Sequence, residues 1–274
     1  MRIKIRHETR FAFDPSGKSI IQTLRMTPRN HEGQRIVSWR MDVNIDCILR
    51  PAEDSFGNVL HTFSAEGPVS GFTITAEGEV ETFDMSGIVR GGIERFPNDI
   101  YLRETDQTIA DKGLRAFALK AAEGNEGTLD TLHRLMTAVH EGIAIDPDAS
   151  ATDIVPAADI LAARTGSAAN VGQVFAAASR YLGIPTRIIE GYYLAGPFTI
   201  AGGHSWAEAF VEGLGWIGFD AAHDLCPQEN HVRAAVGLDR LGTAPVRVAP
   251  FGGLAKVQIS LNPRLTQSQS QSQS

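Results

Sequence analysis

The chain is poor in cysteine, in positive charge and in long apolar runs, and each absence excludes a class of protein. Only two cysteines, Cys47 and Cys226, occur in 274 residues, which argues against a disulfide framework or a cysteine-based zinc site. A formal net charge of -7 argues against nucleic-acid binding, because phosphate recognition needs a basic surface. No apolar run approaches the roughly 20 residues that span a bilayer, and the charged opening MRIKIRHETRF does not resemble a signal peptide. We therefore expect a cytoplasmic protein with no nucleic-acid or membrane partner.

The first hundred residues predict an all-β domain. Short alternating segments, typical of strands with one buried face, occur at 3–13, 20–26, 36–48, 59–63 and 72–80. Turn-forming residues separate them at 14–17, 54–58 and 67–68. Such spacing favours an antiparallel, β-sandwich-like fold over residues 1–104. Catalytic residue types do not cluster there, so we expect this domain to be structural.

A change of pattern after the first domain predicts an α+β core over residues 105–266. Apolar residues recur at helical spacing in segments 114–121 and 129–139, and Pro156 suits the first turn of a short helix. After Pro185 the alternation returns and predicts strands at 186–194, 204–211 and 216–219, with further strands at 246–249 and 256–261. The QSQSQSQS run at 267–274 predicts a disordered tail.

The segment 165–185, TGSAANVGQVFAAASRYLGIP, predicts the central helix of this core. Ser167 is a good N-cap, because its side-chain oxygen can accept from a free N–H of the first turn. Ala168 is then the first helical residue, and Gly183 with Pro185 ends the helix. A helix start stabilises an anionic nucleophile through its dipole and unpaired N–H groups, yet an alanine occupies this one.

A histidine and an aspartate follow on two of the predicted strands. His204 lies near the start of a strand in GGHSWAEAF, and Asp220 ends the next strand in GLGWIGFD. If both side chains face the helix start, they form a base and the group that orients it, as in Cys-His-Asp catalysis. Taken alone, each residue is more often a packed or turn residue, so the order of the three features carries this interpretation.

At these residues the chain resembles the bacterial transglutaminase-like proteins of the papain-like superfamily. The resemblance rests on the stretches RYLGIPTRIIEGYY, GGHSWAEAFVEGLGWIGFD and ENHVRAAVGLDR, and on HETRFAFDPSGKSIIQTLRMTPR with DSFGNV near the start, so it covers nearly the whole chain. It implies a papain-like core in which a helix packs on an antiparallel sheet. It also implies that His204 is the general base and acid and that Asp220 orients it.

The same resemblance implies that the nucleophile is missing. Counted back from Gly183, the family's cysteine falls on Ala168, its usual acidic residue on Asn170 and its further histidine on Gln173. Beyond Asp220, the usual proline is Ala221 and the common asparagine is His223.

We therefore expect a transglutaminase-like protein with an incomplete triad, either a pseudoenzyme or a scaffold that binds a peptide or a protein amide side chain. The expected cleft is lined by Trp206, Ser167, Asn170 and Tyr192 or its neighbour Tyr193. The alternative is an active amide- or peptide-bond hydrolase or acyltransferase with another nucleophile, Ser167 or Cys226. A metal site at His204, Asp220 and His223 is conceivable, but no ligand spacing requires it. Neither a metal nor an organic cofactor is predicted, and the sequence leaves the oligomeric state open.

Overall fold

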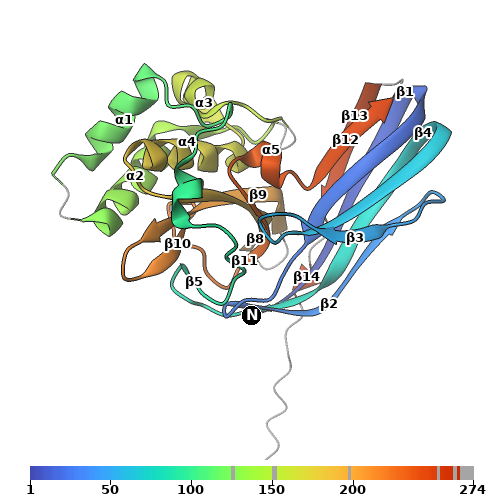
Figure 1. Ribbon diagram of the computed structural model, residues 1–274, viewed down its shortest axis with the longest axis horizontal. Coiled ribbons are helices and arrows are strands. Elements are labelled where there is room, and N and C mark those ends of the chain that lie inside the picture. Colours follow the sequence, from blue (N-terminus) through green and yellow to red (C-terminus); the bar gives the residue numbers. More distant parts are fainter. Residues whose placement is uncertain (125–126, 150–152, 197–198, 252–253, 262–263, 266–274) are drawn as a thin grey trace, which may run out of the picture.

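Two antiparallel sheets organise the chain, and the helices cover only the second (Figure 1). The computed structural model describes residues 1–124, 127–149, 153–196, 199–251, 254–261 and 264–265. The helices are α1 (Lys112–Ala122), α2 (Thr128–Gly142), α3 (Ala157–Ala163), α4 (Ala168–Tyr181) and α5 (Arg240–Thr243), with a 3-10 turn at Asn98–Leu102. Within the described ranges, no helix is long and apolar enough to cross a membrane.

The first sheet is built on two long strands, β1 (Arg2–Thr27) and β4 (Val59–Thr82), which pair along most of their length. The turns predicted at 14–17 and 67–68 are wrong, because the chain does not reverse at either place. Instead the β1–β4 register shifts on either side of Gly17. A Cβ at Gly67 would collide with the carbonyl oxygens of Gly17 and Lys18. The turn residues therefore mark a bend that two paired strands share, as in a β-bulge.

Several shorter strands complete this sheet, three of them from the far end of the chain. They are β2 (Gln34–Val43) and β3 (Arg50–Glu53), which pair with β4, and β12 (Val246–Phe251), β13 (Leu254–Leu261) and β14 (Arg264–Leu265), which pair with β1. The strands predicted after residue 246 thus belong to the N-terminal sheet and not to the core, because the free edge of β1 needs a hydrogen-bonding partner.

The second sheet has the order β11-β8-β9-β10-β5 and carries the helices. Its strands are β8 (Thr186–Gly196), β9 (Thr199–Val211), β10 (Gly215–Phe219), β11 (His231–Gly237) and β5 (Ile88–Val89); a separate parallel pair joins β6 (Ala144–Ile145) to β7 (Thr165–Gly166). Helix α4 is buried from Ala169 to Arg180 and packs on β8 and β9. It begins at Ala168, as predicted, and Gly183 follows it with a φ of 79°. The α+β architecture is confirmed.

The chain forms two units, one around each sheet, and side chains of the first unit hydrogen-bond to the outer edge of β11 in the second. The Gln34 amide accepts from the N–H of Arg233 at 2.8 Å and donates to the carbonyl of the same residue at 2.9 Å. The Asn58 amide makes the same pair of bonds with Val236, at 2.8 and 2.7 Å. These amides replace a neighbouring strand, because buried backbone groups need partners. The two units are therefore joined at the strand that begins with His231.

Candidate functional site

The site begins at the first turn of α4, where the backbone is that of a normal helix start. Ser167 is extended, with φ -68° and ψ 151°, and its carbonyl accepts from the N–H groups of Asn170 and Val171. The predicted side-chain cap is wrong, because the Ser167 hydroxyl makes no capping bond. Its Oγ is buried and has no hydrogen-bond partner among the described residues. This hydroxyl is therefore not used in capping the helix.

The packing of α4 on β9 directs Ala168 towards His204. Phe175 stacks on Phe219, which pairs with Ala207 of β9. One turn nearer the helix start, a Cβ at Gly172 would lie 3.3 Å from Trp206 and 3.5 Å from the Ser205 carbonyl.

Each step towards the start of α4 therefore moves back along β9. Ala168 lies a further turn along the same helix face, because residues four apart share a face. It is half-buried, whereas the twelve residues after it are buried. Ala168 is thus placed on the His204 side, at the part of the helix that solvent reaches.

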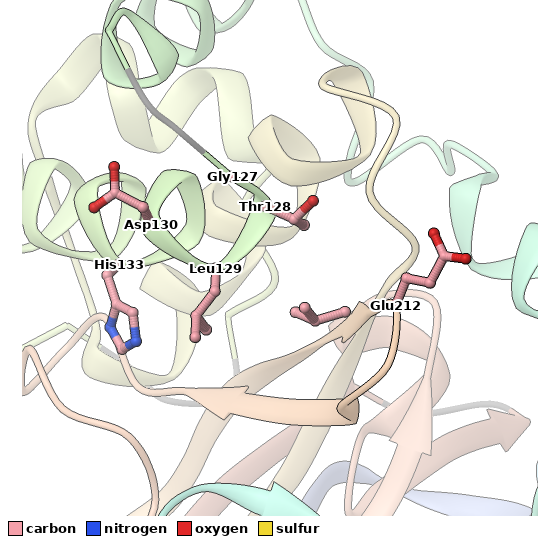
Figure 2. A pocket seen from close by; sticks show the side chains of 7 residues that line it. Gly127, Thr128, Leu129, Asp130, His133 and Glu212 are labelled. Carbon is pink, nitrogen blue, oxygen red and sulfur yellow. The ribbon is translucent and has the colours of Figure 1, made fainter.

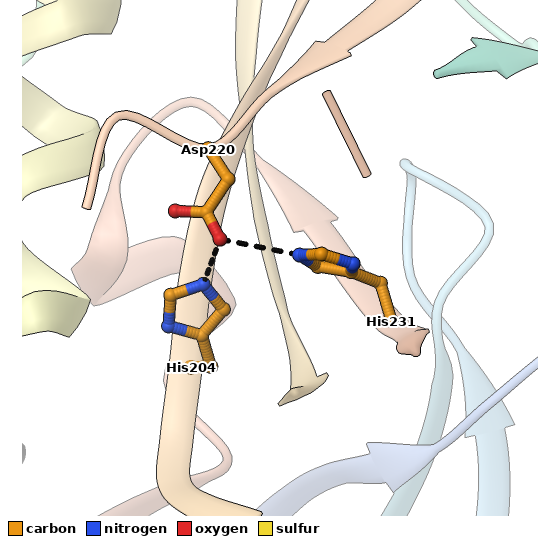
Figure 3. Close-up of side chains that lie close together, drawn as sticks. All are labelled: His204, Asp220 and His231. Atoms are coloured by element: carbon orange, nitrogen blue, oxygen red, sulfur yellow. Dashed lines mark hydrogen bonds and ion pairs between the residues drawn. The ribbon is translucent and has the colours of Figure 1, made fainter. Parts of the chain in front are cut away.

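His204 and Asp220 form a buried pair. The Nε2 atom of His204 lies 2.7 Å from Oδ2 of Asp220, and neither side chain is exposed (Figure 3). The other ring nitrogen, Nδ1 of His204, is buried and has no partner in the described part of the chain. The Asp220 backbone is fixed by a bridge to Leu225. An imidazole held by a carboxylate through one nitrogen, with the other nitrogen free, is the arrangement of a general base and its orienter.

Two more histidines contact the same carboxylate oxygen: His223, which the sequence offered beside His204 and Asp220 as a conceivable metal ligand, and His231, which it did not. His223 Nδ1 lies 2.8 Å from Asp220 Oδ2, and His231 Nε2 lies 3.1 Å from it. The ring of Tyr193 packs against all three imidazoles, at centroid distances of 5.3 Å from His204, 4.2 Å from His223 and 4.7 Å from His231. Only the stretch HVR had drawn attention to His231, and nothing in its spacing indicated a contact with Asp220.

The charges of this cluster favour an ionised aspartate. Burial alone raises the pKa of the Asp220 carboxyl, but the charge of His204 and hydrogen bonds from His204, His223 and His231 outweigh burial, and the pKa ends well below its usual value. Burial lowers the pKa of His231, although Asp220 opposes the change. The site therefore holds an anionic carboxylate among imidazoles.

The predicted cleft residues have different surroundings. Trp206 is buried beneath the cluster, with its ring 5.9 Å from that of His204 and 5.3 Å from that of His231. Tyr192 contacts His7 of the first sheet at 3.3 Å, within the core that joins the two units. Its neighbour Tyr193 takes the place beside His204, because successive residues of a strand face opposite sides.

Asn170 and Gln173 hold the helix start in position rather than facing an open cleft. The Asn170 amide donates to the Asp153 carbonyl and accepts from Arg240 Nη1, at 2.9 and 2.8 Å. Gln173 donates to the Val155 carbonyl at 2.8 Å and accepts from the N–H of Arg240 at 3.0 Å. Both amides therefore connect α4 to α5 and to the segment before α3.

Neither Cys226 nor a surface hollow beside α2 has the buried histidine–aspartate pair of the cluster. Burial raises the pKa of the Cys226 thiol, which is the opposite of what an activated thiolate requires. A surface hollow of about 610 Å³, lined partly by Asp130, His133 and Glu212, lies where α2 begins and β9 ends (Figure 2). Glu212 lies eight residues beyond His204 in the sequence. Because an extended strand advances about 3.3 Å per residue, this hollow is separate from the His-Asp cluster.

Two family models match most of the chain. The model of the bacterial transglutaminase-like N-terminal region matches residues 3–81, and that of the transglutaminase-like superfamily matches 115–221, which ends just beyond Asp220. Residues 115–221 thus match the transglutaminase-like superfamily, and residues 3–81 match the N-terminal region found with it in bacterial proteins. No curated protein matches it.

One solved structure has the same fold over nearly the whole chain. A candidate cysteine protease from Cytophaga hutchinsonii is 18% identical, with a TM-score of 0.77 over 98% of this chain and 92% of that one. The periplasmic domain of TgpA from Pseudomonas aeruginosa is 14% identical, with a TM-score of 0.41 over 79% of this chain and 87% of that one. At these identities the first likeness shows the fold alone, and the second is too slight to support an argument.

Proposed function

We propose that this transglutaminase-like protein is a pseudoenzyme that binds a peptide or a protein amide side chain without cleaving it. The supporting observation is that Ala168 is the first residue of α4, from which we infer, by the helical spacing to Gly172 and Phe175, a side chain on the His204 side. An alanine cannot form the thioester through which this chemistry proceeds. The retained His204 and Asp220 then serve to recognise a polar group, since the buried Nδ1 of His204 is without a partner among the described residues.

One observation favours the alternative of an active amide- or peptide-bond hydrolase or acyltransferase. The Ser167 Oγ is buried and unpartnered within the described ranges, and the residue immediately precedes Ala168. If its hydroxyl faced His204, the pair would form a serine nucleophile and its base. Ser167, however, precedes α4 in an extended conformation, so its side chain does not continue the helix face formed by Phe175, Gly172 and Ala168. We therefore place the pseudoenzyme first.

Restoring the thiol tests the vacant position. Ala168→Cys is made in a background of Cys47→Ser and Cys226→Ser, and iodoacetamide alkylation is followed as a function of pH in the presence of EDTA. We expect a thiol with a pKa below its ordinary value of about 8.5, because a helix start and a neighbouring imidazole both stabilise the thiolate. Adding His204→Ala should raise that pKa again. An inert thiol in the single variant would contradict the assignment of Ala168 as the nucleophile position.

The parent protein tests the absence of turnover. Amidase and transamidation assays with glutamine-containing peptides should give no rate above that of His204→Ala, while binding of the same peptides should weaken in that variant. A rate that depends on both His204 and Ser167 would establish the alternative instead. If neither a rate nor binding is found, the peptide-binding proposal is wrong.

A further inference from the structure

Three imidazole nitrogens from separate segments meet at one oxygen of Asp220. His204 comes from β9, His223 from the turn after β10, and His231 from the first residue of β11 (Figure 3 draws His204 and His231). Their nitrogens lie 2.7, 2.8 and 3.1 Å from Asp220 Oδ2. The ligating atoms of His204, Asp220 and His231 all lie within 4.8 Å of one another. The cluster thus brings together three nitrogen donors and one oxygen donor.

Acid–base chemistry does not account for this arrangement. A base and its orienter require only His204 and Asp220, which leaves His223 and His231 without a role. A carboxylate oxygen offers about two lone pairs, yet three imidazoles share Oδ2. In the described structure the other oxygen, Oδ1, accepts from the N–H of Ala222 at 3.1 Å. A cation at the centre of the cluster would relieve this competition, because each imidazole would then present a lone pair to the ion.

The outer contacts of the cluster suit metal ligands. Nδ1 of His231 lies 2.9 Å from Oδ1 of Asn230 and 3.2 Å from the backbone N of Gln228. It therefore has an acceptor nearby when it carries the proton and a donor nearby when it does not. Loss of the Nε2 proton to a metal would leave Nδ1 protonated and bonded to Asn230. Partners of this kind fix the orientation of a metal-bound histidine.

We propose that His204, His223, His231 and Asp220 form a site for a divalent transition-metal ion of the zinc type. Imidazole and carboxylate ligands suit zinc, whereas magnesium and calcium prefer all-oxygen sites. Tetrahedral zinc with bonds of about 2.0–2.2 Å keeps its ligands roughly 3.4 Å apart, so on metal binding the imidazole nitrogens would move about half an ångström away from Asp220 Oδ2 and closer to one another. The His223 side chain, 30% exposed, gives the ion access from solvent.

This inference goes beyond the proposed function and does not rest on it. Bound metal would occupy the nitrogen and the oxygen that link His204 to Asp220, so the two could not act as an acid–base pair at the same time. Metal binding is measured on the parent protein without any substrate. The metal site and the pseudoenzyme assignment can therefore fail separately.

Titration of the metal-free, untagged protein tests the site. Cys47→Ser and Cys226→Ser are introduced so that no thiol contributes, bound metal is removed with a chelator that is then dialysed away, and Zn²⁺ binding is followed by calorimetry. We expect one ion per chain. Co²⁺ in its place should give the intense visible bands of a tetrahedral site.

Conservative variants separate ligation from folding. His223→Asn keeps a donor for Asp220 but removes the imidazole from the partly exposed ligand, and it should weaken Zn²⁺ binding at least tenfold. His231→Ala should do the same, and circular dichroism checks that each variant is folded. His61→Ala removes a histidine of β4 in the other sheet and should bind as the parent does. Absence of zinc binding to the parent, or unchanged binding in a folded His223→Asn protein, would overturn the proposal.

Discussion

Replacing Glu190 by glutamine should make the protein more stable at pH 8 than at pH 5, relative to the parent. Glu190 lies on β8 and is 2% exposed, and neither of its oxygens has a hydrogen-bond partner among the described residues. Arg240 Nη2 lies 3.7 Å from Oε2, which is an ion-pair distance rather than a hydrogen bond. Burial raises the pKa of the Glu190 carboxyl to about 7, although the charge of Arg240 opposes it.

The sign and size of this pH effect follow from the coupling between protonation of Glu190 and folding. Because the pKa of Glu190 is higher in the folded state, its protonation favours folding. This stabilising contribution is complete below the unfolded value of 4.5 and is lost as the pH rises through about 7. The gap between these values, at about 1.36 kcal/mol per pH unit, corresponds to about 3 kcal/mol. Glutamine imitates the protonated form and cannot ionise. The difference in unfolding free energy between Glu190→Gln and the parent should therefore grow by about 3 kcal/mol between pH 4.5 and pH 8.

Urea unfolding at several pH values measures this difference. The readout is how the difference in unfolding free energy changes with pH. A pH-independent effect of the amide group beside Arg240 therefore cancels. His7, which lines the same small cavity, has its pKa lowered from 6.5 to about 4 by burial. Its contribution to the pH dependence of stability is present in both proteins and cancels in their difference. Glu212→Gln, an exposed carboxylate at the end of β9, is the matched control and should keep the parent's pH dependence. Parallel curves for Glu190→Gln and the parent would refute the reasoning.

Three further changes should destabilise the core. Glu208→Gln breaks buried ion pairs to Arg187 and Arg233, at 2.7 and 2.8 Å, and should lower the unfolding free energy by about 3–5 kcal/mol; a loss below 1 kcal/mol in urea would contradict this. Gly191→Ala would push a Cβ against the Val232 carbonyl and to 2.8 Å from a Trp206 ring carbon, which should cost at least about 1–3 kcal/mol of unfolding free energy. An unchanged melting temperature would contradict this and show that β8 and β11 can move apart. Phe219→Ala removes a fully buried ring stacked on that of Phe175 and should cost about 3–5 kcal/mol in the same thermal assay, and a melting temperature equal to the parent's would contradict this.

Local signals explain what could be predicted about the site. The start of α4 at Ala168 and its end before Gly183 follow from residues within one turn of each end, because helix ends depend on local backbone groups. The pairing of His204 with Asp220 follows from their places on neighbouring strands, together with the family resemblance. The cap role of Ser167 failed although its backbone has the expected conformation, since a side-chain bond also depends on the rotamer that the surroundings allow.

Long-range contacts explain what could not be predicted. Turn residues at Gly17 and Gly67 look the same in sequence whether a strand reverses or two paired strands bend together, and only the pairing of β1 with β4 distinguishes the cases. Nothing local shows that the strands after residue 246 return to β1.

The sequence by itself determined the position of α4, the α+β fold class and the alanine at the start of the central helix, because these depend on residue identity and local periodicity. Only the tertiary structure decided that Tyr193 and not Tyr192 lies beside His204, and that His223 and His231 join it at Asp220. The physical reason is that the face a strand residue presents, and the partners it meets, depend on the register of strands that are distant in the chain.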